Sequence, residues 1–464
     1  MKKKILIGSV IAIAISGIIY VAINHGRVNS YENGTISKSS ETAASDSESN
    51  IDWTTYDNYT IDLDESSSSN NEVNITEAGV YTISGTTTST IYVNCDGEVK
   101  IILDNATITT KNGPAIYIEN ASSTYIELVG STTINATTTS TLDAAIYSKD
   151  DLYLYGTGSL TINSNYDGIA SKDDLCIYSG TYNITASADG IKGKDSVAIK
   201  DGTFNIKASE DAIKTTNEED TSKGYIVIDG GTYSISSTND GISAVTTLTI
   251  NNGIFTIKTT GNASSESAKG LKASTLIEIN DGTIDINATD DGIHSNGNIT
   301  INGGKITINS KDDAIHADGM IEINNGTFEI TAAEGIEATY VKINDGTINI
   351  SASDDGINAG NKSSAYSVAI EINGGNITIK MGSGDTDAID SNGNIYVNGG
   401  TINITGQSAF DYDGEAKYTG GTIIVNGETT NAITNQFGGM GGMMQGENSG
   451  GMMPNGGMNR GGRR

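Results

Sequence analysis

Short runs in which isoleucine alternates with polar residues recur along most of the chain, and glycine-containing turns separate them. One copy contains three such runs, at residues 291–295 (DGIHS), 298–302 (NITIN) and 305–309 (KITIN). Alternation with a period of two places one row of side chains inside a β-structure and the other row outside. The pattern therefore predicts three short strands in each copy.

The tripeptide Asp-Gly/Ala-Ile marks each copy, and in the basic step it returns after 21 or 22 residues, as from Asp167 to Asp189. No copy can bury its own apolar row, so consecutive copies must stack in register around one continuous aliphatic core. Insertions at 216–223, 258–269 and 361–367 lengthen some steps. The marks start at Asp167, Asp189, Asp211, Asp240, Asp291, Asp313, Asp355 and Asp387, with Lys269 and Glu334 in the same slot of two further copies.

This period predicts an all-β fold: a right-handed parallel β-helix, which is a solenoid of about 22-residue, three-strand coils, over residues 51–437. A sandwich or propeller would need longer strands joined by antiparallel hairpins, and collagen would need a three-residue period. We expect the irregular residues 51–74 to cover the first coil, because an open end would present a free sheet edge. Cys95 and Cys176 are several coils apart, beyond disulfide reach, and are expected to be buried.

The two ends of the chain differ from the repeats. Residues 1–24 combine Lys2, Lys3 and Lys4 with an apolar run from 5 to 23, which predicts a signal anchor or a signal peptide. Residues 25–50 have too little apolar content to fold and are predicted to be a disordered spacer, and the Gly/Met-rich residues 438–464 a disordered tail. We therefore expect a monomer on the extracellular face of the membrane or the cell surface of a bacterium, held to the membrane through its N-terminal segment.

A formal net charge of −30 argues against nucleic acid as a partner, because phosphate binding needs a basic surface. An acidic surface favours cations, and carboxylates that stack along a solenoid must find a turn N–H, a basic neighbour or a metal. An aspartate before glycine commonly satisfies the backbone of its own turn, which is the alternative interpretation. Paired aspartates in several coils suit Ca²⁺, which takes six to eight oxygen ligands, and the predicted metal ligands are Asp290, Asp291, Asp312, Asp313, Asp354, Asp355, Asp387 and Asp390.

The position directly after the isoleucine of each mark should point outward and form a row along the solenoid. Its occupants change from basic to imidazole to acidic in the order Lys192, Lys214, Ser243, Lys272, His294, His316, Glu337, Asn358, Asp390, Asp411. Such a row is either a graded track for a linear polymer or a merely solvated face. The stacked pair His294 and His316 is either inert or suited to a transition metal or acid–base role. The predicted carbohydrate contacts are Lys192, Lys214, Lys272, His294, His316 and Asn358, together with Tyr147 and Tyr166, whose rings can lie flat on a sugar.

Several of these motifs carry a family resemblance. Residues 144–152, 189–197, 219–225, 267–273 and 353–359 resemble, in order, the bacterial carbohydrate-binding domain family with a pectate-lyase-like β-helix. The resemblance spans roughly Asn74 to Gly427, and the Gly/Met-rich tail is also typical of that family. It implies extracellular binding of cellulose or acidic sugars and bound calcium, and it carries over no catalytic residue.

Three functions follow from these observations. The favoured one is a non-catalytic, cell-surface polysaccharide-binding protein for cellulose or an acidic polymer such as polygalacturonate, assisted by Ca²⁺. A structural or adhesive surface protein is the second. A calcium-dependent lyase is the third, and it needs a strong base to remove a proton beside the uronate carboxyl group. Pectate-lyase-like enzymes often use arginine for this, but no arginine lies between Arg27 and Arg460, so Lys192, Lys194 and Lys214 are the only clustered candidates.

Overall fold

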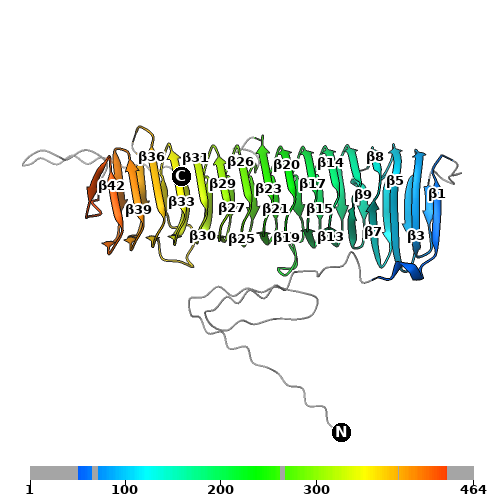
Figure 1. The fold of residues 1–464 in the computed structure, drawn as a ribbon, viewed down its shortest axis with the longest axis horizontal. Coiled ribbons are helices and arrows are strands. Elements are labelled where there is room, and N and C mark those ends of the chain that lie inside the picture. Colours follow the sequence, from blue (N-terminus) through cyan, green and yellow to red (C-terminus); the bar gives the residue numbers. More distant parts are fainter. Residues whose placement is uncertain (1–50, 65–71, 140, 262–266, 385, 436–464) are drawn as a thin grey trace, which may run out of the picture.

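The described residues form a straight rod in which strands of successive turns pair in parallel, and only the last strand pairs antiparallel (Figure 1). The computed structural model describes residues 51–64, 72–139, 141–261, 267–384 and 386–435. They make an all-β parallel solenoid of about 16 turns with a coil spacing of ~22 residues and almost no helix. The predicted fold class and repeat length are therefore confirmed.

The predicted membrane segment, spacer and tail, residues 1–24, 25–50 and 438–464, lie outside the described residues. Within the described ranges, no helix is both long and apolar enough to cross a bilayer. The one helical element there is the single 3₁₀ turn η1 (Trp53–Thr55).

Each turn contributes to three faces, and face 1 carries the Asp-Gly/Ala-Ile marks. In order along the rod its strands are β2 (Glu72–Ile75), β4 (Thr90–Asn94), β6 (Ile116–Asn120), β9 (Ala144–Ser148), β12 (Asp167–Ser171), β15 (Ile191–Gly193), β18 (Ile213–Thr215), β21 (Ile242–Ala244), β24 (Leu271–Ala273), β27 (Ile293–Ser295), β30 (Ile315–Ile323), β32 (Ile336–Ile343), β34 (Ile357–Ala359), β37 (Asp387–Ser391) and β40 (Ser408–Tyr412). The strands β30 and β32 continue from face 1 into face 2.

Face 2 follows face 1 along the chain. Its strands are β1 (Asn58–Asp62), β3 (Gly79–Thr87), β5 (Glu98–Thr110), β7 (Ser123–Leu128), β10 (Leu152–Gly156), β13 (Asp174–Ile177), β16 (Ser196–Ile199), β19 (Tyr225–Ile228), β22 (Thr247–Ile250), β25 (Leu276–Ile279), β28 (Asn298–Ile301), the second halves of β30 and β32, β35 (Ala369–Ile372), β38 (Asn394–Val397) and β41 (Ala416–Tyr418).

Face 3 begins in the second halves of β3 and β5, which bend out of face 2. It continues through β8 (Ser131–Ala136), β11 (Ser159–Ser164), β14 (Thr181–Ala186), β17 (Thr203–Ala208), β20 (Thr232–Ser237), β23 (Ile254–Thr259), β26 (Thr283–Asn287), β29 (Lys305–Asn309), β31 (Thr327–Ala332), β33 (Thr347–Ala352), β36 (Asn376–Met381), β39 (Thr401–Thr405), β42 (Thr422–Val425) and β43 (Glu428–Thr430).

The interior is a continuous aliphatic core, as the alternation predicts. Isoleucines at one position of successive turns, such as Ile293, Ile315 and Ile336, lie in register and are fully buried. Face 3 adds an internal stack of rings from Tyr182 through Phe204 and Tyr233 to Phe255, with successive ring centroids 5.1, 4.8 and 4.5 Å apart. Cys95 and Cys176 are both buried and free, as expected.

Two kinds of turn hold the coils in register. At the face 1 corner, a Cβ on Gly292 would lie 2.5 Å from Ile308 Cγ2 and 2.6 Å from the Ala314 carbonyl oxygen, so this slot accepts only a very small residue. Between faces 2 and 3, asparagines of successive turns form an amide ladder with Nδ2 to Oδ1 distances of 2.7 to 3.0 Å, through Asn251, Asn280, Asn302, Asn324, Asn344, Asn373 and Asn398. Every amide in such a ladder donates to one turn and accepts from the other.

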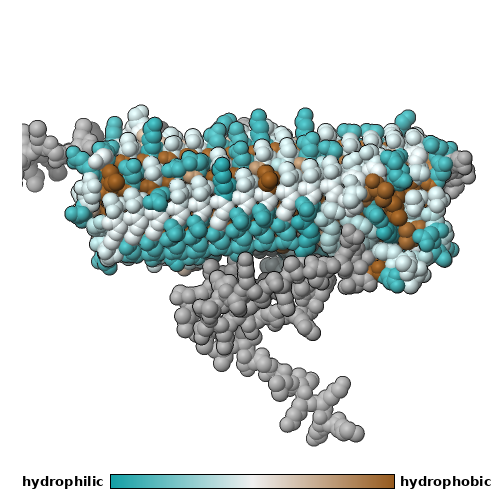
Figure 2. Space-filling model, viewed as in Figure 1, coloured by the Kyte–Doolittle hydropathy of each residue, from teal (hydrophilic) through white to brown (hydrophobic). Residues whose placement is uncertain are grey.

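The two ends of the rod close differently. The expectation that residues 51–74 form an irregular cover is only partly right, because β1 and β2 already stack in parallel on β3 and β4. Trp53, just before β1, packs edge-on against Tyr125 with a centroid distance of 5.3 Å. At the other end β43 folds back antiparallel on β42, the one antiparallel pairing among the described strands. Along the side drawn in Figure 2, hydrophilic side chains gather in bands that follow the rod.

Candidate functional site

The aspartates of face 1 join each turn to the next one. One carboxylate oxygen, Oδ1, accepts the backbone N–H that occupies the same slot in the following turn, as from Asp189 to Asp167 at 2.9 Å and from Asp240 to Asp211 at 2.8 Å. The same bond recurs at Asp189, Asp240, Asp291 and Asp355. The carboxylates therefore do satisfy backbone groups, but those of the neighbouring turn instead of their own. In the turns where a basic side chain stands three positions later, the other oxygen, Oδ2, contacts that side chain.

The predicted outward row is one register ladder of face 1. The pairing runs Tyr92, Tyr117, Tyr147, Ala170, Lys192, Lys214, Ser243, Lys272, His294, His316, Glu337, Asn358, Asp390, Asp411. The stacking brings together all ten positions predicted for the row and extends it by five toward the N-terminal end, the fifth being Asn74, which pairs with Tyr92. We call this ladder the outward row.

In the lysine segment of the outward row, Lys192 to Lys272, ammonium groups neutralise the corner aspartates. Lys192 Nζ pairs with Asp167 and lies 3.4 Å from Asp189 Oδ2, while Lys214 Nζ lies 2.8 Å from Asp211 Oδ2. Burial works against the charge of Lys192, yet its carboxylate neighbours raise its pKa above the ordinary lysine value. Burial also raises the pKa of Asp167, to about 6. These ions are buried pairs that compensate one another.

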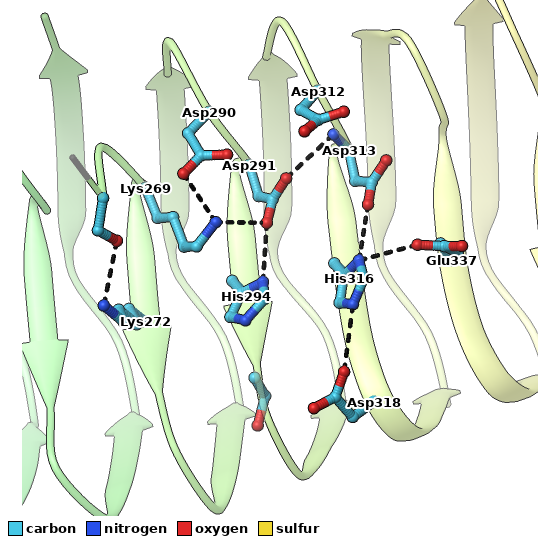
Figure 3. Close-up of polar contacts among 12 residues, drawn as sticks. Lys269, Lys272, Asp290, Asp291, His294, Asp312, Asp313, His316, Asp318 and Glu337 are labelled. Carbon is cyan, nitrogen blue, oxygen red and sulfur yellow. Dashed lines mark hydrogen bonds and ion pairs between the residues drawn. The ribbon is translucent and has the colours of Figure 1, made fainter. Parts of the chain in front are cut away.

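The imidazole segment follows, with ring centroids of His294 and His316 stacked 4.8 Å apart (Figure 3). His294 Nδ1 lies 2.7 Å from Asp291 Oδ2, an oxygen that Lys269 Nζ also contacts at 2.7 Å. Burial alone would raise the pKa of Asp291, but the hydrogen bond with His294 and the charge of Lys269 outweigh it and lower this pKa to about 2. His316 Nδ1 instead faces Asp313 at 2.6 Å and Glu337 at 2.9 Å. Burial alone would lower the pKa of His316, but these two carboxylates outweigh it and raise this pKa to about 10.

The acidic segment comprises Asn358, Asp390 and Asp411 of the outward row, with Asp355 and Asp387 at their corners. Within the described ranges, no lysine or histidine lies at ion-pair distance from Asp355, Asp390 or Asp411. Burial and the neighbouring carboxylates of Asp355, Asp411 and Asp387 raise the pKa of Asp390 to about 7. Burial likewise raises the pKa of Asp355 to about 6. Asp355, Asp390 and Asp411 therefore have no basic counter-ion within the described ranges.

The predicted metal ligands fall into two groups of three and two separate residues. Asp290 and Asp291 share the ammonium of Lys269, and their carboxylates come within 4.8 Å of one from Asp312. Asp313 faces His316, while Asp354 is exposed. Asp355, Asp387 and Asp390 belong to the acidic segment, where Asp387 and Asp390 come from one strand, β37. The eight predicted ligands thus do not form one site, and the acidic segment is where cation partners are fewest.

The predicted aromatic contacts lie apart from each other. Tyr147 belongs to the outward row but is only 5% exposed, with Lys172 Nζ over its ring at 5.3 Å from the centroid. Tyr166 is half-buried at the corner before Asp167, outside the row. The more accessible rings of the row, Tyr92 and Tyr117, were missed. Their signal is the same Ile-Tyr step, in copies that lack the aspartate mark.

Sequence reasoning also missed a carboxylate group at the corner between faces 1 and 2. Asp151, Asp173 and Asp174 place oxygens within 4.8 Å of one another. The doubled aspartates at 150–151 and 173–174 were its sequence signal.

A groove of about 640 Å³ lies along the lysine segment, lined by Lys214, Ser243 and Lys272. Its wall is the insertion at 216–223, which includes Asn217 and Asp220. Asn217 fixes that insertion by donating to Asp195 Oδ1 at 2.6 Å and accepting from the N–H of Glu219 at 3.0 Å. A polymer on face 1 would therefore be bordered on one side here.

The lysine base candidates do not suit proton removal. Lys192 and Lys214 each sit among aspartates that raise their pKa, so both ammonium groups stay protonated and cannot accept a proton. Lys194 is half-buried next to them and forms no ion pair with a described residue. Neither Lys192 nor Lys214 is therefore suited to supply the strong base that β-elimination requires.

Comparison with known proteins gives a family for the chain. A family model described as carbohydrate-binding domain-containing protein matches residues 69–314 and 307–436. One solved structure, titled as the polysaccharide lyase-like protein from C. thermocellum, gadolinium derivative, is similar with 31% identity over 49% of this chain and 96% of that chain, at a TM-score of 0.42. No curated protein matches. The chain belongs to the family of carbohydrate-binding domain-containing proteins.

Proposed function

We propose that the protein binds a linear acidic polysaccharide without cleaving it, along the outward row, with Ca²⁺ bridging the acidic segment to carboxylates of the polymer. The membership in a carbohydrate-binding family supports the ligand class. The observation that carries the calcium part is that Asp355, Asp390 and Asp411 have no basic partner among the described residues. In earlier turns of the same face, lysines of the outward row neutralise the aspartates at the corner.

Calcium suits this segment because every available group is a hard oxygen donor. Ca²⁺ takes six to eight oxygens in flexible geometry, and a row of carboxylates on a flat face supplies only part of that shell. The carboxylates of a polyuronate would complete it. Burial, and after it the repulsion by neighbouring carboxylates, raises the pKa of Asp390 to about 7, and a bound cation would offset that repulsion.

The lysine segment has a different task in this proposal. Its ammonium groups are already paired with aspartates, so their net charge is compensated and they offer spare N–H donors to sugar hydroxyl groups. The groove beside Lys214 and Lys272 gives the chain of sugars a wall. A neutral glucan such as cellulose would use this segment and depend little on calcium.

The test is binding of polygalacturonate and of a neutral glucan to the full-length protein in calcium or in EGTA. We expect EGTA to release polygalacturonate while leaving the neutral glucan much less affected. Asp390→Asn should weaken polygalacturonate binding at least tenfold in calcium. Asp285→Asn removes the same charge from an exposed position of face 3 and is the matched control, which should bind normally. Polygalacturonate binding that is unchanged in both EGTA and the Asp390 variant would contradict the proposal.

We further propose that the protein is exported and displayed on the bacterial surface. The basis is the sequence alone: Lys2, Lys3 and Lys4 followed by the apolar run 5–23. Protease treatment of intact cells should digest the solenoid, whereas protection equal to that of a cytosolic marker would refute surface display.

A further inference from the structure

His316 stands between two carboxylates that compete for one proton. Its Nδ1 lies 2.6 Å from Asp313 Oδ2, in the same turn, and 2.9 Å from Glu337 Oε2, in the next turn (Figure 3). The three side chains are only 12%, 10% and 6% exposed, respectively. A single N–H directed at two buried, negatively charged oxygens satisfies both only partly, whereas a cation at the centre would attract all three ligand atoms.

The groups behind these ligands hold them in place. The other ring nitrogen of His316, Nε2, faces Asp318 Oδ1 at 3.5 Å, so when a metal displaces the Nδ1 proton the remaining ring proton stays on Nε2 and the lone pair of Nδ1 faces the metal. The second oxygen of Glu337, Oε1, pairs with Lys362 Nζ at 2.7 Å, which leaves Oε2 directed at His316. A histidine backed by a carboxylate is the usual outer arrangement of a metal-binding imidazole.

We propose that Asp313, His316 and Glu337 bind a divalent transition-metal ion of the zinc class. One imidazole nitrogen with two carboxylates suits Zn²⁺, Co²⁺ or Ni²⁺, while Ca²⁺ prefers a shell of oxygens alone. In the tetrahedral geometry of Zn²⁺, ligands at about 2.0 to 2.1 Å from the metal lie about 3.3 to 3.4 Å from each other. The pair at 2.9 Å needs to open by about 0.4 Å, and the pair at 2.6 Å by about 0.7 Å, when the metal replaces the proton.

At the neighbouring histidine, His294, the adjacent carboxylate already has a basic partner. His294 has one close carboxylate, Asp291, and the ammonium of Lys269 already neutralises that carboxylate at 2.7 Å. No second acid faces His294 in the way that Glu337 faces His316 among the described residues. His294 therefore serves as the matched control, since its ring is the same, is stacked on His316 and is nearly as buried.

The metal would join two turns of the solenoid, because Asp313 and His316 come from one turn and Glu337 from the next. Its binding should therefore raise the thermal stability of the rod, which is a readout independent of any sugar. This inference does not rest on the proposed polysaccharide function, and either can fail alone.

The experiment is titration of Co²⁺, then Zn²⁺, into the untagged full-length protein after chelator treatment. We expect saturable binding at one ion per chain, a visible Co²⁺ absorption band that Zn²⁺ removes and a large excess of Ca²⁺ does not, and a rise in melting temperature. His316→Ala and Glu337→Gln should each weaken binding at least tenfold, while Asp318→Asn and Lys362→Met should weaken it by about tenfold through loss of ligand orientation.

His294→Ala decides the placement. Retention of the Co²⁺ band and of the affinity in this variant supports the site as assigned. An equal loss in the His294 and His316 variants, with both still folded by circular dichroism, would overturn it in favour of a metal between the two rings. Absence of stoichiometric binding in the unaltered protein would overturn it altogether.

Discussion

The lysine segment and the acidic segment share one backbone but differ in charge. In both, a corner aspartate uses Oδ1 to accept the N–H of the next turn, as Asp189 does at 3.1 Å and Asp355 at 3.1 Å. Three positions later stands Lys in one segment and Asn or Asp in the other. The backbone role is therefore fixed by the stacking, while the partner of the second oxygen is free to vary. A solenoid can thus change the chemistry of one face from end to end without changing its fold.

The largest effect we expect is on the stability of the lysine segment. Lys192→Ala leaves Asp167, whose side chain is 2% exposed, without its cation, so the free energy of unfolding should fall by about 3 kcal/mol. Chemical denaturation measures this. Lys207→Ala, at an exposed position of face 3, is the control and should change the free energy of unfolding little. An equal effect of both substitutions would mean that the ion pairs of the lysine segment are dispensable.

The next effect comes from moving the lysine pattern into the acidic segment. Asn358→Lys places an ammonium three positions after Asp355, the spacing at which Lys214 neutralises Asp211 at 2.8 Å. We expect the affinity for Ca²⁺ to fall about tenfold, or by about 1.4 kcal/mol, because the new ammonium group neutralises the carboxylate and repels Ca²⁺. Calorimetric titration of calcium measures it. Calcium binding as tight as in the unaltered protein would show that Ca²⁺ does not bind at the acidic segment.

A smaller effect is expected in the pH dependence of stability without calcium. Asp355 and Asp390 have pKa values of about 6 and about 7 in the folded protein, above the ordinary aspartate value. Between about pH 4 and 7 the folded state therefore binds more protons than the unfolded chain, and the free energy of unfolding contributed by these groups falls as pH rises. Asp390→Asn should remove part of that fall. Because Asp390 keeps partial solvent contact, we expect a gain on the order of 1 kcal/mol at pH 8.

The measurement is the difference in the free energy of unfolding between Asp390→Asn and the unaltered protein from pH 4 to 8, in EGTA. Other titrating groups cancel in this difference. A difference that is flat with pH would show that burial and the neighbouring carboxylates do not raise the pKa of Asp390 in the folded protein.

The smallest effect tests whether the two segments really share one scaffold. Asn280→Ala beside the lysine segment and Asn373→Ala beside the acidic segment each remove one amide from the same ladder. Both should lower the free energy of unfolding by about 1 kcal/mol, to within a few tenths. Unequal costs, measured by denaturation in calcium-free buffer, would mean that the charge on face 1 alters packing at the other corners.

The repeat period predicted the solenoid, the buried isoleucines and the order of the outward row, because stacking places equal positions of successive copies directly above one another. It could not predict which atoms the corner aspartates contact. The bond from Asp189 N–H to Asp167 depends on the corner conformation, which the period does not contain. Tyr92 and Tyr117 escaped because the first coils lack the aspartate that aligned the other copies.

The repeat also could not predict contacts made by residues from irregular parts of the chain. Lys362, which holds Glu337, comes from an insertion, and an insertion has no counterpart in other copies by which to align it. Lys269 was recognised as the occupant of an aspartate slot, but its contact with both Asp290 and Asp291 requires the next turn to be in place. Contacts between turns need the three-dimensional register as well as the period.

A crystal structure of the protein grown with saturating calcium tests the central claim most directly. We predict calcium density on the acidic segment, ligated by Asp355 and Asp390 carboxylates, and none between Lys192 and Lys272, where lysines occupy the place of the ion. Calcium bound among those lysines, or a fully ordered acidic segment with no ion at saturating concentration, would contradict the account.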